Sequence, residues 1–370
     1  MSSMTRRRFI ACSGLAAASA LAGSAVQGST EYRRVEARHW NGLQGKAVRC
    51  RLCPRNCRIP EGGRGFCRVR ENSGGVLYTL SYGFPCAVHL DPIEKKPFFH
   101  FLPGTSALSL STVGCNMTCL FCQNWQISQS SPEDISAGFT EPGRIAKRAV
   151  SAGASSIAYT YGEPVVFYEY MMDTAEKARS LGVRNVVVSN GYIEERPLRE
   201  LCGAVDAIKV DLKAWDPDYY RDVCGAGLEP VLRSLEVIRS EGVWLEIVYL
   251  VVPTLNDDPD RIAEMARWVR GTLGEDVPVH FSRFFPGYRM KNLPPTPVST
   301  LERAWKICRD EGLRHVYTGN VPGGGHETTF CPECGREVVE RTGFRATAVR
   351  LEEGLCAFCS APVAGIWGGE

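Results

Sequence analysis

Between residues 107 and 318 the sequence alternates short apolar runs with longer amphipathic segments. We predict strands at the apolar runs, which are 107–113, 156–161, 185–189, 207–212, 243–252, 277–284 and 315–318. We predict helices at the intervening segments, which are 143–152, 165–181, 196–202, 228–241, 260–273 and 300–312. Strands that alternate with helices form βαβ units around a parallel sheet. The pattern therefore predicts an α/β fold, in the form of a partial or full (β/α) barrel.

The 16 cysteines are unevenly placed, and eleven of them fall into three groups with the short spacings of metal ligands. The groups are Cys50, Cys53, Cys57 and Cys67; Cys115, Cys119 and Cys122; and Cys331, Cys334, Cys356 and Cys359. Thiolates are soft ligands that favour zinc or iron–sulfur clusters. The outer two groups predict small Cys-rich metal modules at both ends of the fold.

The central group is a C-x3-C-x2-C triplet in the loop after the first predicted strand. A [4Fe–4S] cluster usually takes four cysteines, one for each iron. Three cysteines leave one iron open, and an open metal position is where chemistry can take place. A zinc ion with a fourth ligand from elsewhere in the chain is the alternative.

The C-terminal group consists of two C-x2-C pairs, which predict a closed tetrahedral site with a structural role. Zinc is the simplest occupant, and a rubredoxin-like iron is the alternative. The N-terminal group, C-x2-C-x3-C-x9-C, fits either zinc or an auxiliary iron–sulfur cluster.

Local composition divides the chain into further segments. Residues 1–28 resemble a twin-arginine export signal, with Arg6-Arg7-Arg8 before an apolar stretch that is too short for a stable membrane span. We expect a metal module at 46–75, a proline-rich connecting segment at 76–106, the barrel at 107–325 and a zinc-ribbon-like module at 326–370. The signal suggests export, whereas chemistry at reduced metal clusters suggests the cytoplasm.

The formal charge of +2 indicates no nucleic-acid partner.

Polar residues follow four successive predicted strands at their carboxyl ends. The triplet follows the first strand, and the next three ends carry Gly162-Glu163-Pro164, Ser189-Asn190 and Asp211-Leu212-Lys213. In a (β/α) barrel these ends meet on one face, where active sites are built. Each segment alone would be a routine turn or cap, but together they predict one site.

These motifs resemble those of the radical S-adenosylmethionine (SAM) superfamily, in its pyruvate formate-lyase activating-enzyme branch. A closer resemblance is to the radical SAM enzyme of the AmmeMemoRadiSam system. The supporting segments are 91–97, 100–104, 122–125, 159–164, 280–284 and 294–297, together with the Cys-rich ends. The resemblance runs from about residue 46 to the end of the chain.

The resemblance implies that Cys115, Cys119 and Cys122 hold a [4Fe–4S] cluster whose open iron binds SAM. One electron from a low-potential donor then cleaves SAM to methionine and a 5′-deoxyadenosyl radical, which abstracts a substrate hydrogen. The implied SAM-binding residues are Phe121 at the adenine, Gly162, Glu163 and Pro164 at the methionine moiety, and Ser189, Asn190, Asp211 and Lys213 as SAM or cation contacts. Activating enzymes commonly have D-T-N-G where this chain has Val188-Ser189-Asn190-Gly191, and the missing carboxylate argues against a bound cation.

The substrate, a protein side chain or a small molecule, is not identified by the sequence. Lys95, Lys96, His100, His280 and Arg283 could hold an anionic substrate at the barrel mouth, or could be surface and packing residues. Two further functions fit the motifs: an activase that installs a glycyl radical on a partner, and a non-catalytic iron–sulfur electron-transfer or scaffold protein. A scaffold protein would have no need of the strand-end residues, which favours the enzyme.

Overall fold

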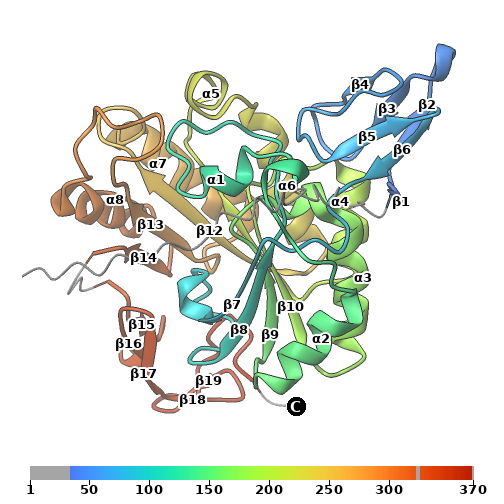
Figure 1. Ribbon diagram of the computed structural model, residues 1–370. Coiled ribbons are helices and arrows are strands. Elements are labelled where there is room, and N and C mark those ends of the chain that lie inside the picture. The colour runs from blue at the N-terminus through green and yellow to red at the C-terminus, as the bar shows by residue number, and fades with distance from the viewer. Residues whose placement is uncertain (1–33, 322–325, 369–370) are drawn as a thin grey trace, which may run out of the picture. The chain divides into compact units, whose positions relative to one another are not determined.

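The computed structural model describes residues 34–321 and 326–368 (Figure 1). The signal segment predicted at residues 1–28 lies outside the described residues. The centre of the fold is an eight-stranded sheet with the order β14-β13-β12-β11-β10-β9-β8-β7. Its strands are β7 (Ala87–Pro92), β8 (Ser106–Ser111), β9 (Ser156–Tyr159), β10 (Arg184–Ser189), β11 (Ala207–Asp211), β12 (Trp244–Val251), β13 (Val279–Arg283) and β14 (Val316–Gly319).

Strands β8 to β14 run parallel, as predicted, because a helix returns the chain between successive strands. Strand β7 pairs antiparallel with β8 at one edge, inside the segment that was expected only to connect. Across the part of the chain that the structure describes, β7 and β14 are not paired with each other, so the sheet stays open. The partial barrel is therefore confirmed, and the closed barrel is wrong.

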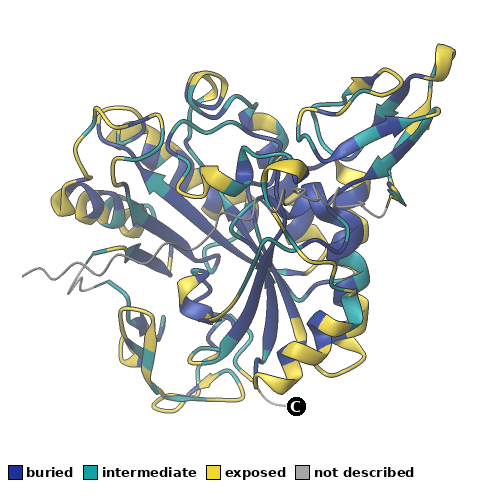
Figure 2. Ribbon diagram, viewed as in Figure 1, coloured by how far each residue is buried: buried dark blue, intermediate teal, exposed yellow. Residues whose placement is uncertain are grey.

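Helices cover the outer face of this sheet, and their solvent sides are exposed (Figure 2). The main ones are α2 (Pro142–Ser151), α3 (Tyr168–Arg179), α4 (Glu195–Cys202), α6 (Leu228–Ser240), α7 (Pro259–Trp268) and α8 (Val298–Asp310). Short helices are α1 (Trp125–Ser128) and α5 (Pro217–Tyr219), and single turns are η1 (Gln44–Lys46), η2 (Ile93–Lys95), η3 (Pro132–Asp134), η4 (Pro164–Phe167), η5 (Tyr220–Cys224) and η6 (Val269–Leu273). Helix α7 begins at a capping residue, because the Asp258 carboxylate accepts from the amides of Asp260 and Arg261 at 2.9 and 3.0 Å. Among the described residues, we find no helix with the length and apolarity that crossing a membrane requires.

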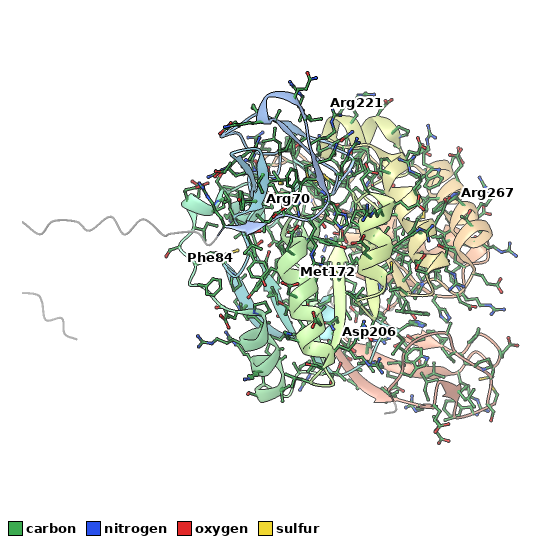
Figure 3. All side chains as sticks on the ribbon, turned by 90° about the vertical axis from the view of Figure 1, so that its right-hand side faces the viewer. Arg70, Phe84, Met172, Asp206, Arg221 and Arg267 are labelled. Carbon is green, nitrogen blue, oxygen red and sulfur yellow. The ribbon has the colours of Figure 1, made fainter. Side chains whose placement is uncertain are left out.

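The N-terminal module consists of two three-stranded antiparallel sheets. One contains β1 (Val35–Glu36), β6 (Val76–Thr79) and β5 (Arg70–Ser73), and the other contains β2 (Trp40–Gly42), β3 (Val48–Cys50) and β4 (Arg58–Ile59). Its buried residues Val48, Ile59 and Val69 belong to the same hydrophobic core as the central sheet. Arg70 lies inside the protein near α3, whereas Arg221 and Arg267 point outward (Figure 3).

The C-terminal module contains β15 (Thr329–Phe330), β16 (Glu337–Thr342) and β17 (Arg345–Val349), followed by the hairpin β18 (Leu351–Glu352) and β19 (Leu355–Cys356). It has a small core of its own, made of Cys331, Val338, Cys356 and Val363. The following tail binds the main body through Ile366, whose carbonyl accepts from the amide of Leu102 at 2.7 Å.

The amino-terminal end of the sheet is closed by the segment that follows β7. Ile93, Phe98 and Phe101 are fully buried against small residues at the starts of the parallel strands, such as Ala107 and Ala207. Apolar side chains therefore fill this end of the open barrel. The carboxyl ends of the strands remain for a functional site.

Candidate active site at the carboxyl ends of the strands

A cleft of about 560 Å³ lies at the carboxyl ends of the parallel strands. It contains the three cysteines of the central triplet. Of the eight residues predicted to bind SAM, seven line the cleft: Phe121, Gly162, Glu163, Ser189, Asn190, Asp211 and Lys213. The eighth, Pro164, is buried at the first position of η4 and does not line it. The strand ends thus bring residues from four separate βα loops into one space.

The loop that carries the triplet is held by backbone hydrogen bonds to the 220–225 segment. The amide of Thr118 donates to the carbonyl of Cys224 at 3.0 Å, and the amide of Leu120 donates to the carbonyl of Val223 at 3.0 Å. Gly225, with φ of +63°, is needed here because a Cβ at that position would lie 2.4 Å from the Thr118 hydroxyl oxygen. The loop conformation is thus set by contacts far along the chain.

The three cysteines of the triplet are half-buried at the wall of the cleft. Burial raises the pKa of Cys115 and of Cys122, whereas a hydrogen bond from Cys224 lowers the pKa of Cys119. Cys224 stood outside the three groups in the sequence, and its position beside Cys119 comes from the fold alone. Buried thiolates need a compensating positive charge, which a metal supplies.

Glu163 is held by the end of β10. One carboxylate oxygen accepts from the Ser189 hydroxyl at 2.7 Å, and the other accepts from the Asn190 amide at 2.8 Å. Burial raises the pKa of Glu163 to about 7, against the effect of these donors. Before it, Gly162 lets β9 approach β8, because a Cβ there would lie 2.8 Å from the Ser111 hydroxyl oxygen. A buried carboxylate that faces the cleft is suited to bind an ammonium group.

Asp211 lies between two lysines. Its carboxylate pairs with Lys209 and, at 2.8 Å, with Lys213. Burial would raise the pKa of Asp211, but the two ammonium groups hold it below its ordinary value. Lys209 was not among the predicted site residues. The strand period of two could have identified it, since positions 209 and 211 face the same side of β11.

At the other end of the cleft lie Lys95 and Lys96, which the sequence had proposed for substrate binding. Lys96 is buried, pairs with Asp91 at 2.7 Å and lies 4.2 Å from the centre of the Tyr161 ring. Tyr161 in turn donates to Asp91. Asp91 was missed as a site residue because it lies in a segment that was expected only to connect. Tyr161 was missed because it looks like an ordinary residue at the end of a predicted strand.

The remaining substrate candidates do not line the cleft. His280 and His100 lie in a buried network around Glu246, which accepts from the His100 amide at 2.9 Å and lies 2.7 Å from His280 Nε2. Arg283 donates to the carbonyl of Thr296 at 2.7 Å. The sequence left open whether these three residues face the barrel mouth or pack within the fold. The structure favours packing, because they support the sheet and its connections.

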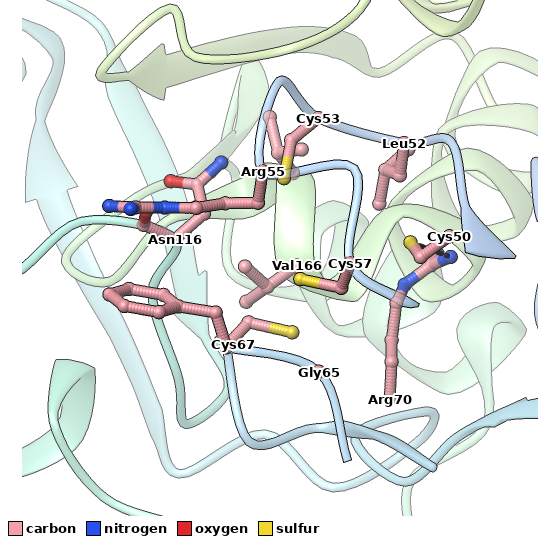
Figure 4. A pocket seen from close by; sticks show the side chains of 12 residues that line it. Cys50, Leu52, Cys53, Arg55, Cys57, Gly65, Cys67, Arg70, Asn116 and Val166 are labelled. Atoms are coloured by element: carbon pink, nitrogen blue, oxygen red, sulfur yellow. Dashed lines mark hydrogen bonds between the residues drawn. The ribbon is translucent and has the colours of Figure 1, made fainter. Parts of the chain in front are cut away.

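The two outer cysteine groups differ in geometry. In the C-terminal group, the sulfurs of Cys331 and Cys359 are 3.7 Å apart, and those of Cys334 and Cys356 are 3.8 Å apart. These four ligand atoms all lie within 4.8 Å of one another. The N-terminal four line a cavity beside η4 and the triplet loop, with Arg55, Arg70 and Asn116 (Figure 4).

Comparison with known proteins agrees with this geometry. The sequence model described as the Radical SAM superfamily matches residues 109–267. The uncharacterized protein MJ0808 of Methanocaldococcus jannaschii is 46% identical over 326 residues, which cover 88% of this chain and 97% of that protein. The pyruvate formate-lyase 1-activating enzyme of Escherichia coli K12 is 22% identical over 219 residues, covering 55% of this chain and 89% of the enzyme.

Among solved structures, a radical SAM methyltransferase from Sphaerobacter thermophilus aligns with a TM-score of 0.47 at 19% identity, covering 60% of this chain and 68% of that one. Members of the superfamily use a [4Fe–4S] cluster and SAM and need a reductant. The match over residues 109–267 begins in β8 and spans the triplet and the three strand ends that follow it. With a three-cysteine loop on the carboxyl face of an open parallel sheet, this chain belongs to the radical SAM superfamily.

Proposed function

We propose that this protein is a radical SAM enzyme, in which Cys115, Cys119 and Cys122 hold a [4Fe–4S] cluster and the strand-end residues hold SAM. The observation that supports this most is the cleft, where three thiols meet a buried carboxylate, Glu163, and a partly exposed ammonium, Lys213. A protein that only carried electrons would not need such a pocket beside its cluster.

The donor set fits this cofactor. Among the described residues, the sulfurs of the triplet are not part of any group whose ligand atoms all lie within 4.8 Å, so they are spread too widely for a single ion. A cluster that binds one thiolate at each iron requires wider spacing. When bound, the cluster supplies the electron that cleaves the sulfonium of SAM to methionine and a 5′-deoxyadenosyl radical.

The residues of the chain position SAM and exclude water. Glu163 offers its carboxylate to the ammonium of the methionine moiety, and Lys213 offers a positive charge to the carboxylate. Gly162 exposes backbone to the ligand, and Phe121 supplies an apolar ring for the adenine. Pro164, outside the cleft, fixes the direction in which the chain leaves this turn.

Ser189 and Asn190 act through Glu163, which they orient by hydrogen bonds. Asp211 is already neutralised by two lysines, so we assign it to holding Lys213 and not to a bound cation. The absence of a bound cation agrees with the sequence of this strand end, where Val188-Ser189-Asn190-Gly191 lacks the aspartate that activating enzymes commonly have.

The test is anaerobic reconstitution with iron and sulfide, followed by dithionite and SAM. We expect 5′-deoxyadenosine and methionine from the native protein and none from Cys119→Ala. Cys86→Ser is the matched control, because Cys86 is a half-buried thiol outside the three groups. Absence of both products from a fully loaded native protein would refute the proposal, and unchanged cleavage by Cys119→Ala would refute the ligand assignment.

We further propose that the C-terminal cysteines bind a structural zinc ion. Zinc at about 2.3 Å from each sulfur places tetrahedral sulfurs about 3.8 Å apart. The observed separations of 3.7 and 3.8 Å agree with that edge length. A rubredoxin-like iron would fit the same geometry, and elemental analysis of purified protein distinguishes the two.

Within the superfamily, we propose membership of the AmmeMemoRadiSam branch, on the motif Asp91-Pro92-Ile93-Glu94-Lys95-Lys96-Pro97. The structure gives this motif a location, since Lys95, Lys96 and Pro97 line the cleft. Lys95 is half-exposed there and can reach an anionic group of a substrate. Replacing it with Met should weaken substrate binding and leave uncoupled SAM cleavage unchanged; reduced cleavage without substrate would contradict this role.

A further inference from the structure

We propose that Cys50, Cys53, Cys57 and Cys67 bind a second iron–sulfur cluster of the [4Fe–4S] class, and not a zinc ion. We also propose that its place beside the triplet suits it to pass single electrons to the SAM-binding site. The second statement depends on the proposed function; the first does not.

The spacing of the sulfurs favours a cluster over a zinc ion at this site. The C-terminal group provides an internal standard for a single ion, because its four sulfurs all lie within 4.8 Å of one another. Across residues 34–321 and 326–368, no three of the N-terminal sulfurs meet that condition. Figure 4 shows the four side chains directing their sulfurs toward a common space from different sides. A [4Fe–4S] cube, which binds one thiolate at each corner iron, fits this wider arrangement.

The surroundings suit a buried anionic cluster. Leu52, Val165 and Val166 line the cavity and exclude water. Arg55 and Arg70 also line it. The charge of Arg70 is paired with Glu169, and its Nη1 donates to the sulfur of Cys50 at 3.8 Å. Hydrogen bonds to sulfur and nearby positive charge stabilise a cluster with four thiolate ligands.

Four protein ligands leave no open iron, so this cluster would carry electrons and not bind substrate. Its surroundings place it next to the triplet loop. A Cβ at Gly114, the residue before Cys115, would lie 2.7 Å from the carbonyl oxygen of Cys67. The backbones of a ligand of one site and of the residue before a ligand of the other are thus in direct contact.

Asn116 connects the two sites as well. It lines the N-terminal cavity, and its carbonyl oxygen accepts from Arg55 Nε at 2.9 Å. Its side-chain oxygen accepts from the Asn190 amide group at 2.9 Å, and the same amide nitrogen lies 3.9 Å from the sulfur of Cys115. One residue and a short chain of hydrogen bonds therefore separate the two cysteine groups.

The electron balance is simple. A low-potential one-electron carrier, of the flavin or iron–sulfur class, reduces the N-terminal cluster, which is reoxidised when it reduces the cluster at the triplet. Each transfer moves one electron, and no bond is formed or broken. The carrier supplies the reductant that members of the superfamily need.

The first test is metal analysis of the full-length protein after anaerobic reconstitution. We expect about eight iron atoms per chain, four for each cluster, and about four in Cys53→Ala/Cys67→Ala. The triplet variant Cys115→Ala/Cys119→Ala/Cys122→Ala should also retain about four. The control, Cys334→Ser/Cys359→Ser, should lose zinc and keep all its iron.

About four iron atoms in the native protein, with loss of zinc from Cys53→Ala/Cys67→Ala, would overturn the assignment. Retention of the C-terminal zinc by Cys53→Ala/Cys67→Ala and by the triplet variant shows that these two variants have folded. If the proposed function failed instead, the native protein would hold both clusters and still not cleave SAM. The two failures are therefore distinguishable.

The second test is electron paramagnetic resonance of the reduced protein. Two adjacent paramagnetic clusters should broaden each other's signals, and either single-site variant should show one unbroadened signal. Signals in the native protein that equal the sum of those of the two variants would overturn the proposed proximity.

Discussion

The two ends of this protein each present four cysteines, yet the fold uses them differently. At the N-terminal end the sulfurs are spread around a cavity, and the module shares the hydrophobic core of the central sheet. At the C-terminal end the sulfurs are 3.7 to 3.8 Å apart, and the module has a core of only a few residues. The same number of cysteines thus gives two different sulfur arrangements, and the packing of the loops sets the distances between the sulfurs.

The largest effect should come from removing a ligand at the C-terminal end. Cys331→Ser should lose the metal ion, whose binding to a structural site stabilises a small domain by about 10 kcal/mol or more. Because its own core is small, the module should unfold locally while the central sheet persists. Hydrogen exchange would show loss of protection confined to residues 326–368. Protection equal to that of Cys86→Ser would contradict the difference between the two ends.

Each Cys-rich module is also attached to the central part of the fold by one buried arginine, Arg70 at the N-terminal end and Arg341 at the C-terminal end. Arg70 pairs with Glu169, whereas Arg341 lies 3.9 Å from Glu94 and donates to the carbonyl of Phe99. Arg70→Met would leave the Glu169 carboxylate buried without its charge partner and should lower the free energy of unfolding by about 3–5 kcal/mol.

Arg341→Met should lower the free energy of unfolding by less than Arg70→Met, because the distance between Arg341 and Glu94 is longer than that between Arg70 and Glu169. Chemical denaturation of both variants measures the difference. The double variant Arg70→Met/Glu169→Gln should recover part of the loss, since it leaves no unpaired charge. Equal destabilisation by Arg70→Met and Arg341→Met would remove this contrast.

A smaller loss of stability should follow from lowering the pH, at the histidines near the C-terminal module. Burial lowers the pKa of His315 to about 4, and its ring lies 4.3 Å from that of His100, whose pKa burial also lowers. The unfolded chain binds these protons at higher pH than the folded one, so stability is lost as the pH falls from 6.5 toward 4. For His315 the loss amounts to about 3 kcal/mol.

His100 Nδ1 donates to the carbonyl oxygen of Ala364 at 2.6 Å, so the added proton would go to Nε2, which lies 2.6 Å from the Tyr317 hydroxyl. Protonation should therefore disturb the contact between His100 and Tyr317. Thermal unfolding between pH 4 and 7 measures the effect. The variant His315→Gln should flatten the pH dependence. An unchanged slope in that variant would exclude His315 as its source.

The smallest effect should come from the contact between the N-terminal module and the triplet loop. Gly114 has φ of +98°, and a Cβ there would collide with the Cys67 carbonyl, so Gly114→Ala should cost about 1–3 kcal/mol. It should also move the two cysteine groups apart. Gly143→Ala is the control, since a Cβ there meets nothing within 4 Å. Equal melting temperatures for the two variants would show that Gly114 and the Cys67 carbonyl are not in close contact.

The periodicity of the sequence was enough to locate the parallel strands, because buried parallel strands are nearly continuous apolar runs. The predicted strand at 243–252, for example, compares with β12 at Trp244–Val251. Strand β7 was missed for the same reason. As an edge strand it exposes His89 and Leu90 and ends in Pro92, so it lacks an apolar run.

The strand-end residues could be grouped in advance because parallel strands end at one edge, and seven of the eight do line one cleft. Cys224 and Asn116 could not, since their importance depends on contacts with distant segments. His100 and His280 were misplaced because position along the chain does not show depth inside a barrel; Glu246 at the closed end of the sheet holds both.

Sequence alone determined the candidate ligands, their order and the strands that precede them, because these follow from local composition and period. Tertiary structure decided how far apart the ligands stand. The difference between two close pairs of sulfurs at one end and a cavity surrounded by sulfurs at the other arises from how the loops pack. Packing depends on residues far apart in the chain, such as Gly114 against Cys67, and no local pattern encodes that distance.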